Sequence, residues 1–250
     1  MGLLRKDTFI CLDCEATGLS VDEDEIIEIA IARFTFDEVV ESFDSLVDPL
    51  RPIPAESTNV HHITDSMVVG KPKIEEVLPL VCKIAAKHIV VGHNIGFDLR
   101  MINNAIRKRN LSCPIFDLEK SIDTLRLARL YAESPTNSLE DLRKHFNIEE
   151  EGAHRAMNDV VVNIKVFKYL SFNFKRTEDV TKRLRQPILM KLMPLGKHKG
   201  RPFHEVPIDY LHWASHQDFD EDLLFTINEE RRRRRTQKPF SQMCNPFSGL

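Results

Sequence analysis

An apolar stretch close to the N-terminus places the tightest limit on what this chain can form. Within "FICLDCEATGL", which begins at Phe9, residues 8–13 have apolar side chains on both faces of a predicted strand. Because neighbouring side chains of a strand point to opposite faces, such a strand must be covered on both sides. We therefore expect a central strand of a sheet with helices packed against each face.

The segments that follow alternate between strand and helix patterns. Further strands are predicted over 25–34 and 39–48, joined by the short link "TFDE" as a hairpin, and over 88–94. Apolar spacing predicts helices over 73–87, 97–109, 122–132, 138–146 and 155–172. Asp123 and Ser138 are interpreted as residues that begin helices. This order predicts an α/β fold, a mixed sheet flanked by helices.

The composition changes near residue 175, where a charged stretch with few large apolar residues runs to Pro187. Beyond it, "GKHKGRPF" predicts a small basic hairpin, followed by a short helix with Tyr210 and Trp213 and another helix over 220–235. The predicted parts are an α/β domain (1–175), a linker (176–187), a small basic α+β module (188–235) and a mobile tail (236–250). The charged stretch before Pro187 is equally compatible with an exposed helix.

Two acids stand where the first strand ends. Asp13 and Glu15 are two residues apart, so their side chains lie on the same face of a strand. Like charges this close are unfavourable unless a cation lies between them, and hard divalent cations prefer oxygen ligands. Taken alone, the pair is more typical of a strand end with two solvated acids than of a metal site.

Two later segments supply further candidates for the same site. Asp98, in "GHNIGFDLRMI", falls in the first turn of a helix, where an acid also complements the helix dipole. Asp159 lies within the apolar helix "MNDVVVNIKVF", where a carboxylate is costly unless it is paired or metal-bound. His154 precedes that helix and could act as a general base. Together these residues predict a metal centre.

The three patterns D-x-E-x-T-G, H-N-x-x-F-D and H-R-A-x-x-D resemble the signature of the DEDDh 3′–5′ exonuclease superfamily over about residues 7–172. The resemblance implies a ribonuclease H-like fold and metal-dependent hydrolysis of DNA, single strands preferred, to 5′-nucleoside monophosphates. It implies two Mg²⁺ or Mn²⁺ ions held by Asp13, Glu15, Asp98 and Asp159, with His154 as general base.

The same resemblance implies contacts with the substrate. "NVHHIT" and "GKHKGRPF" are similar to stretches of exonuclease X-like members of the superfamily. The residues implied to meet the terminal nucleotide are Thr17, Gly18, Leu19, His61, Asn94 and Phe97, although core packing explains Phe97 equally well. Lys197, Lys199 and Arg201 are candidate phosphate contacts. The run Arg231 to Arg235 is explained either by phosphate contact or as the charged end of a helix.

Composition and charge bear on the cellular location and the partners that we expect for the protein. No apolar run of about 18 residues occurs, so we expect no membrane span. Five irregularly placed cysteines favour a reducing cytoplasm. Cys11 and Cys14 are expected to be buried on opposite faces of a strand rather than to bind zinc or to exchange disulfides. The net charge of −3 does not by itself indicate a nucleic-acid partner.

Three alternatives use the same residues. The chain could be a proofreading subunit that binds a DNA polymerase, or a ribonuclease that trims RNA 3′ ends. It could also be a catalytically inactive nucleic-acid-binding module. The presence of all four acids together with His154 argues against the last alternative.

Overall fold

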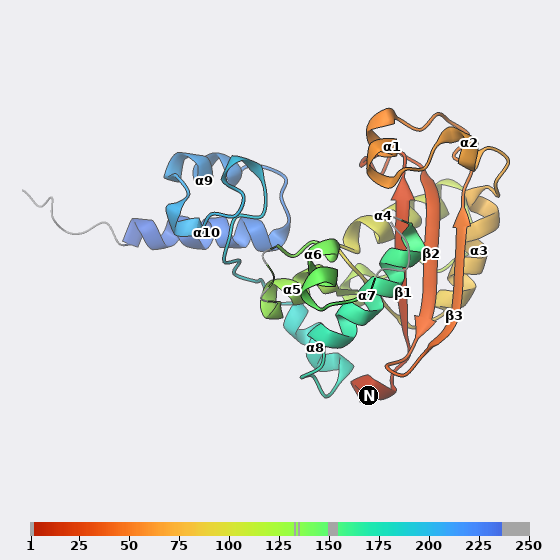
Figure 1. Ribbon diagram of the computed structural model, residues 1–250. Helices are drawn as coiled ribbons and strands as arrows, with labels where there is room; N and C mark the ends of the chain where they lie inside the picture. Colours follow the sequence, from red (N-terminus) through yellow and green to blue (C-terminus); the bar gives the residue numbers. More distant parts are fainter. Residues whose placement is uncertain (1–2, 133, 135, 150–154, 237–250) are drawn as a thin grey trace, which may run out of the picture. The chain divides into compact units, whose positions relative to one another are not determined.

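A five-stranded sheet organises the first of two compact units, which divide between Gln186 and Pro187. The computed structural model describes residues 3–132, 134, 136–149 and 155–236. The strands follow the order β3-β2-β1-β4-β5 across the sheet. Figure 1 shows β3, β2 and β1 side by side in this order. Their bounds are β1 (Phe9–Ala16), β2 (Ile26–Phe34), β3 (Val39–Leu46), β4 (Ile89–Gly92) and β5 (Ile122–Asp123).

The predicted central strand and hairpin are confirmed. Strand β1 pairs antiparallel with β2 and parallel with β4, and every one of its side chains is buried or partly buried. Strand β3 continues the sheet antiparallel to β2, and the short β5 runs parallel to β4. The sheet is therefore mixed and has helices packed against it, as the α/β prediction requires.

The two faces of β1 contact different helices. Phe9 and Cys11 face α7 (Ala156–Leu170): the Phe9 and Phe167 rings lie 5.2 Å apart, and the Cys11 thiol meets the Val160 carbonyl at 3.5 Å. Cys14 belongs to the core on the other face, which includes residues of α3 (Ile74–Ala85) and α4 (Gly96–Lys108). Cys11 and Cys14 are therefore both buried on opposite faces, as expected.

Several helices match the predicted segments, and two were not predicted. Asp123 caps α5 by accepting from the Leu125 N–H, and Ser138 caps α6 by accepting from the Asp141 N–H. The short helices α1 and α2 escaped prediction because one or two turns show no clear apolar period. The remaining bounds are α1 (Ala55–His61), α2 (Asp65–Val68), α5 (Thr124–Tyr131), α6 (Leu139–His145) and the 3₁₀ turns Leu4–Lys6 and Leu118–Lys120.

The stretch over 176–187, expected as a linker or an exposed helix, contains helix α8 (Thr177–Leu184), which belongs to the first unit. Val180 and Leu184 are buried, and the Arg126 guanidinium donates to the carbonyls of Leu184 and Gln186. Two apolar residues four positions apart were enough to dock a helix whose other face is charged. The boundary between the units therefore lies eleven residues later than residue 175.

The second unit folds around its own small core of Met193, Phe203, Leu211, Leu223 and Ile227. The predicted basic hairpin is reduced to a single antiparallel bridge, Leu192 to Pro202, which closes a loop with the 3₁₀ turn Gly196–His198. A second 3₁₀ turn, Phe203–Glu205, follows the bridge. The two predicted helices are present as α9 (Ile208–Ala214) and α10 (Glu221–Thr236). Of the expected mobile tail, residues 237–250 lie outside the described residues.

No helix in the described part of the chain combines the length and apolar character needed to cross a membrane.

Candidate active site

Three carboxylates converge at the end of β1. Asp13, Glu15 and Asp159 each offer a ligand oxygen, and these oxygens all lie within 4.8 Å of one another. Strand β1 directs Asp13 and Glu15 toward α7, and Asp159 lies in the first turn of α7. Residues almost 150 positions apart, from the first and the third of the sequence patterns, thus form one acidic cluster.

Asp98 reaches the same strand from α4. Strand β4 pairs with β1 only as far as Cys11, so the Cys14 N–H has no partner on that side in β4. The buried Asp98 carboxylate accepts this N–H at 2.9 Å. Asp98 lies outside the group of three, but its charge contributes to the raised pKa of Asp13.

Burial makes this cluster electrostatically unfavourable when it is fully charged. Burial raises the pKa of Asp13 well above its ordinary value, and the charges of Asp98 and Asp159 add to the effect. Burial raises the pKa of Glu15 to about 7, again with a contribution from Asp159. Burial raises the pKa of Asp98 to about 6, although hydrogen bonds from Cys14 oppose the shift. An all-oxygen donor set of this kind fits a hard divalent cation, which would stabilise the charged forms.

Glu28 is a residue of this region that the sequence interpretation missed. It lies opposite Glu15 in the β1–β2 register and is fully buried. Its carboxylate accepts from Arg155 Nε at 2.7 Å and from the Ala156 N–H at 3.2 Å. Since Arg155 and Ala156 begin α7, Glu28 fixes the start of the helix that carries Asp159. The available signal was one acid within the apolar run "IIEIAIARF".

The loop that follows β1 uses two of the predicted substrate residues for its own structure. The Thr17 hydroxyl is buried, donates to Asp24 at 2.8 Å and accepts from the Glu25 N–H at 3.1 Å. A Cβ on Gly18 would lie 2.4 Å from a carboxylate oxygen of Asp24, so this position has no room for a side chain. Leu19, in contrast, is 87% exposed and available for contact.

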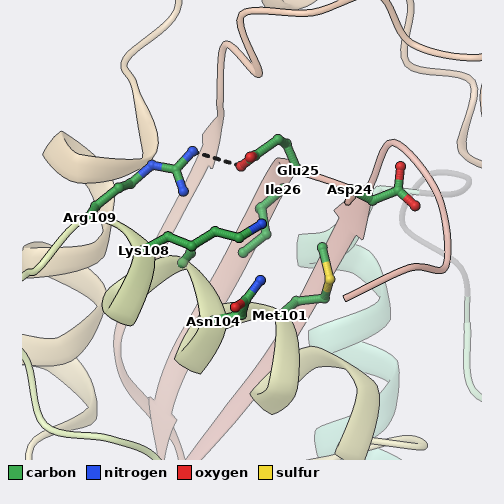
Figure 2. Close-up of a pocket in the computed structure, with 8 residues that line it drawn as sticks. Asp24, Glu25, Ile26, Met101, Asn104, Lys108 and Arg109 are labelled. Atoms are coloured by element: carbon green, nitrogen blue, oxygen red, sulfur yellow. Dashed lines mark hydrogen bonds and ion pairs between the residues drawn. The ribbon is translucent and has the colours of Figure 1, made fainter. Parts of the chain in front are cut away.

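Helix α4 holds the same loop from the other side. Figure 2 shows Asn104, Lys108 and Arg109 on α4, with Arg109 paired to Glu25 at 2.7 Å. Asn104 donates to the Val21 carbonyl at 2.5 Å, and Lys108 donates to the Asp22 carbonyl. These contacts fix the backbone that presents Leu19.

The other predicted nucleotide contacts occupy different settings. His61 is buried, its Nδ1 accepts from the Ile63 N–H at 3.0 Å, and its Nε2 has no partner within the described residues. Asn94 is exposed, with its N–H donating to Asp123 at 3.0 Å. Phe97 is partly buried against the core, so packing accounts for part of its surface. His154 lies outside the described residues.

The basic candidates all belong to the second unit. Lys197, Lys199 and Arg201 lie on the loop closed by the Leu192–Pro202 bridge. Within the arginine run, Arg232 pairs with Glu229, and Arg233 and Arg234 pair with Glu230. These three arginines are therefore used within α10 or close to it, which supports the structural explanation for that part of the run.

Two families match successive parts of the chain. The family described as "Exonuclease" matches residues 10–167, which include all the acids of the cluster. A second family, described as "Putative quorum-sensing-regulated virulence factor", matches residues 181–226, which lie mostly in the second unit.

Individual proteins agree with the first match. DNA polymerase III subunit epsilon of Aquifex aeolicus is 35% identical over 168 residues, 66% of this chain and 80% of the relative. DNA polymerase III PolC-type of Clostridium perfringens is 35% identical over 179 residues, 69% of this chain, but the chain spans only 12% of that relative. Exonuclease X, solved in complex with 5′ overhanging duplex DNA, is 26% identical, with a TM-score of 0.57, over 71% of this chain and 99% of that structure. The chain therefore belongs to the exonuclease family, within the DEDDh-type 3′–5′ exonuclease superfamily.

Proposed function

We propose that the chain is a metal-dependent 3′–5′ exonuclease that hydrolyses DNA, preferably single-stranded, to 5′-nucleoside monophosphates. The observation that carries this proposal is the acidic cluster of Asp13, Glu15 and Asp159, whose ligand oxygens lie within 4.8 Å of one another. Solvated acids at a frayed strand end would not be held this close with raised pKa values. The likeness to exonuclease X, solved with duplex DNA, supports DNA as the substrate.

The four acids are proposed to hold two Mg²⁺ or Mn²⁺ ions. When bound, such ions would supply activation of the attacking water and stabilisation of the departing 3′ oxygen. Asp13, Glu15 and Asp159 form the compact part of the donor set, and Asp98 borders it through the Cys14 N–H. His154 is proposed to take the proton of the attacking water, since it directly precedes Arg155 at the start of α7.

The exposed Leu19 is proposed to pack against the terminal base. Asp24 holds the loop from within and α4 holds it from outside. Binding of a nucleotide therefore costs little conformational entropy of this loop. His61 and Phe97 are proposed to support the nucleotide from the neighbouring elements. Apolar contact of this kind accepts any base, which favours weak sequence preference.

A second candidate function is proofreading within a replicative polymerase. The identity to an epsilon subunit and to a segment of a PolC-type polymerase favours it. The chemistry would be unchanged, and the chain would in addition bind a polymerase. A pull-down with the replicative polymerase separates the two, and RNA substrates tested beside DNA address the ribonuclease alternative.

The direction of digestion provides the first test. We expect linear single-stranded DNA labelled at its 5′ end to be shortened one nucleotide at a time in the presence of Mg²⁺. A closed circular single strand should resist, because it offers no 3′ terminus. Products are resolved by length on a denaturing gel. Cleavage of circles at the rate of linear strands would rule out an exonuclease.

His154 and Asp159 should fail in different ways. His154→Ala should retain Mn²⁺ binding and lose about 10²- to 10⁴-fold in rate, because a base is lost but no ligand. The rise of activity with pH through the imidazole range should vanish in that variant. Asp159→Asn should lose Mn²⁺ affinity together with rate. Calorimetric Mn²⁺ titration and pH–rate profiles measure both, and near-normal turnover of His154→Ala would place the base elsewhere.

Glu28 is proposed as a positioning residue that acts through the start of α7. Glu28→Gln replaces none of the four acids. It should still lower Mn²⁺ affinity or rate by about 10- to 100-fold, the usual effect of losing a partner that orients a ligand. Glu41→Gln is the matched control, because Glu41 also forms an ion pair with an arginine. That pair, with Arg33, joins two strands and is partly exposed.

Arg155→Gln should resemble Glu28→Gln, and the double variant should be no worse than either single one if the two residues act as a pair. Calorimetric Mn²⁺ affinity is the deciding measurement. Unchanged affinity in a folded Glu28→Gln protein would assign the pair to stability alone.

A further inference from the structure

The second unit carries a row of aromatic rings on and beside α9. His198, Tyr210, Trp213 and Phe219 follow one another with centroid separations of 4.6, 5.2 and 6.4 Å. Leu211 and Ala214 are buried and dock α9 on the core of the unit. The face of α9 with Tyr210 and Trp213 is thereby held in a fixed orientation.

Trp213 is the most exposed aromatic ring of this row. Half of its surface (50%) is accessible, and Ile208 on the same helix is 45% exposed. A single exposed apolar side chain is ordinary on a protein surface. A tryptophan that continues a row of rings and leaves its surface half open is a ready surface for stacking.

Unpaired cations adjoin the aromatic row. Lys197 Nζ lies 5.1 Å from the Tyr210 ring centroid. A Cβ on Gly196 would lie 2.4 Å from the Tyr210 hydroxyl, so the loop with Lys197 is pressed directly against this ring. The Arg201 backbone N–H donates to the His198 carbonyl at 3.1 Å, which ties Arg201 to the first residue of the row.

Carboxylates neutralise part of the positive charge of the unit, but not these cations. Arg232, Arg233 and Arg234 pair with Glu229 and Glu230. In the described part of the chain, no ion pair joins Lys197, Lys199 or Arg201 to a carboxylate. The cations beside the aromatic row are therefore available for an anionic partner.

We propose that this surface, defined by Tyr210, Trp213, Lys197, Lys199 and Arg201, binds single-stranded nucleic acid. Bases stack on Trp213 and Tyr210, and the three cations contact the phosphates. A single strand offers the flat apolar rings and the regular negative charges that the surface matches, whereas a purely apolar partner would leave the cations unused. This inference rests on the proposed function and extends substrate binding to the second unit.

Trp213 permits a direct test because it is the only tryptophan of the chain. The full-length protein is titrated with an oligothymidylate of about 16 nucleotides in EDTA, which prevents metal-dependent hydrolysis. We expect saturable quenching of the tryptophan fluorescence that weakens as salt is added. Binding of the oligonucleotide without any change in Trp213 emission would overturn the proposal.

Variants extend the test by anisotropy of a labelled oligothymidylate. Trp213→Ala should weaken binding by about 5- to 100-fold, the usual effect of one lost stacked base. Leu189→Ala is the matched control, because Leu189 is an exposed apolar residue of the same unit without a π face. Equal affinities of Trp213→Ala and the parent protein would contradict the stacking role.

The cations are tested by salt dependence. Replacing Lys197, Lys199 and Arg201 together by Gln should reduce the log–log salt slope by about 2, since each single-strand phosphate contact contributes about 0.7. Arg232→Gln, which removes a cation paired with Glu229, should leave the slope unchanged. An unchanged slope in the triple variant would contradict phosphate contact by this loop.

Hydrolysis of a dinucleotide in Mg²⁺ separates this inference from the proposed function. A parent protein that hydrolyses DNA but shows no Trp213 response refutes only the second-unit surface. A parent protein that hydrolyses neither the dinucleotide nor linear DNA refutes the exonuclease function itself.

Discussion

Repulsion among partly buried carboxylates at the end of β1 is the constraint on which the rest of the first unit depends. Asp13, Glu15 and Asp159 are held within reach of a single ion, in surroundings where burial already disfavours their charged forms. Such an arrangement persists only if the fold opposes the separation of the acids. The same repulsion favours binding of a divalent cation over water or a lone proton. It therefore connects the stability of the fold with its chemistry.

The surrounding residues hold each acid by a different contact. Glu28 binds the start of α7 through Arg155 and Ala156 and so positions Asp159. Asp98 completes the hydrogen bonding of β1 where β4 ends, which brings α4 to the site. The β1 loop is tied to Asp24 and α4, which leaves Leu19 exposed beside the acids. Function therefore depends on contacts well beyond the four acids themselves.

The sequence was sufficient for the parts of the fold that depend on local pattern. The apolar run of β1, the hairpin to β3 and the capped starts of α5 and α6 follow from alternation and capping residues. Asp13 and Glu15 were found at the end of an apolar strand, Asp159 within an apolar helix, and Asp98 in the first turn of a helix after a strand. Glu28 was missed because its role arises only when β2 meets α7. The docking of α8 was missed because only two buried residues specify it. The hydrogen bonds of the Thr17 hydroxyl likewise depend on partners that only the folded chain brings together. The same holds for the ion pairs that Arg232, Arg233 and Arg234 form with glutamates.

The acidic cluster opposes folding unless a divalent cation is bound. This opposition should be visible in the pH dependence of the free energy of unfolding. Glu15 has its pKa raised from 4.5 to about 7, so the folded state keeps a proton that the unfolded state releases in this range. Without metal, the free energy of unfolding should therefore fall as pH rises from about 4.5 to about 7, by about 3 kcal/mol for Glu15. The free energy of unfolding in urea is measured for the parent protein and for a Glu15→Gln variant, and the difference between the two isolates this contribution. Added Mn²⁺ should reverse the loss of stability, and increasingly so at higher pH. A parent-minus-variant difference that rises with pH in EDTA, or stabilisation by Mn²⁺ that does not grow with pH, would contradict the account.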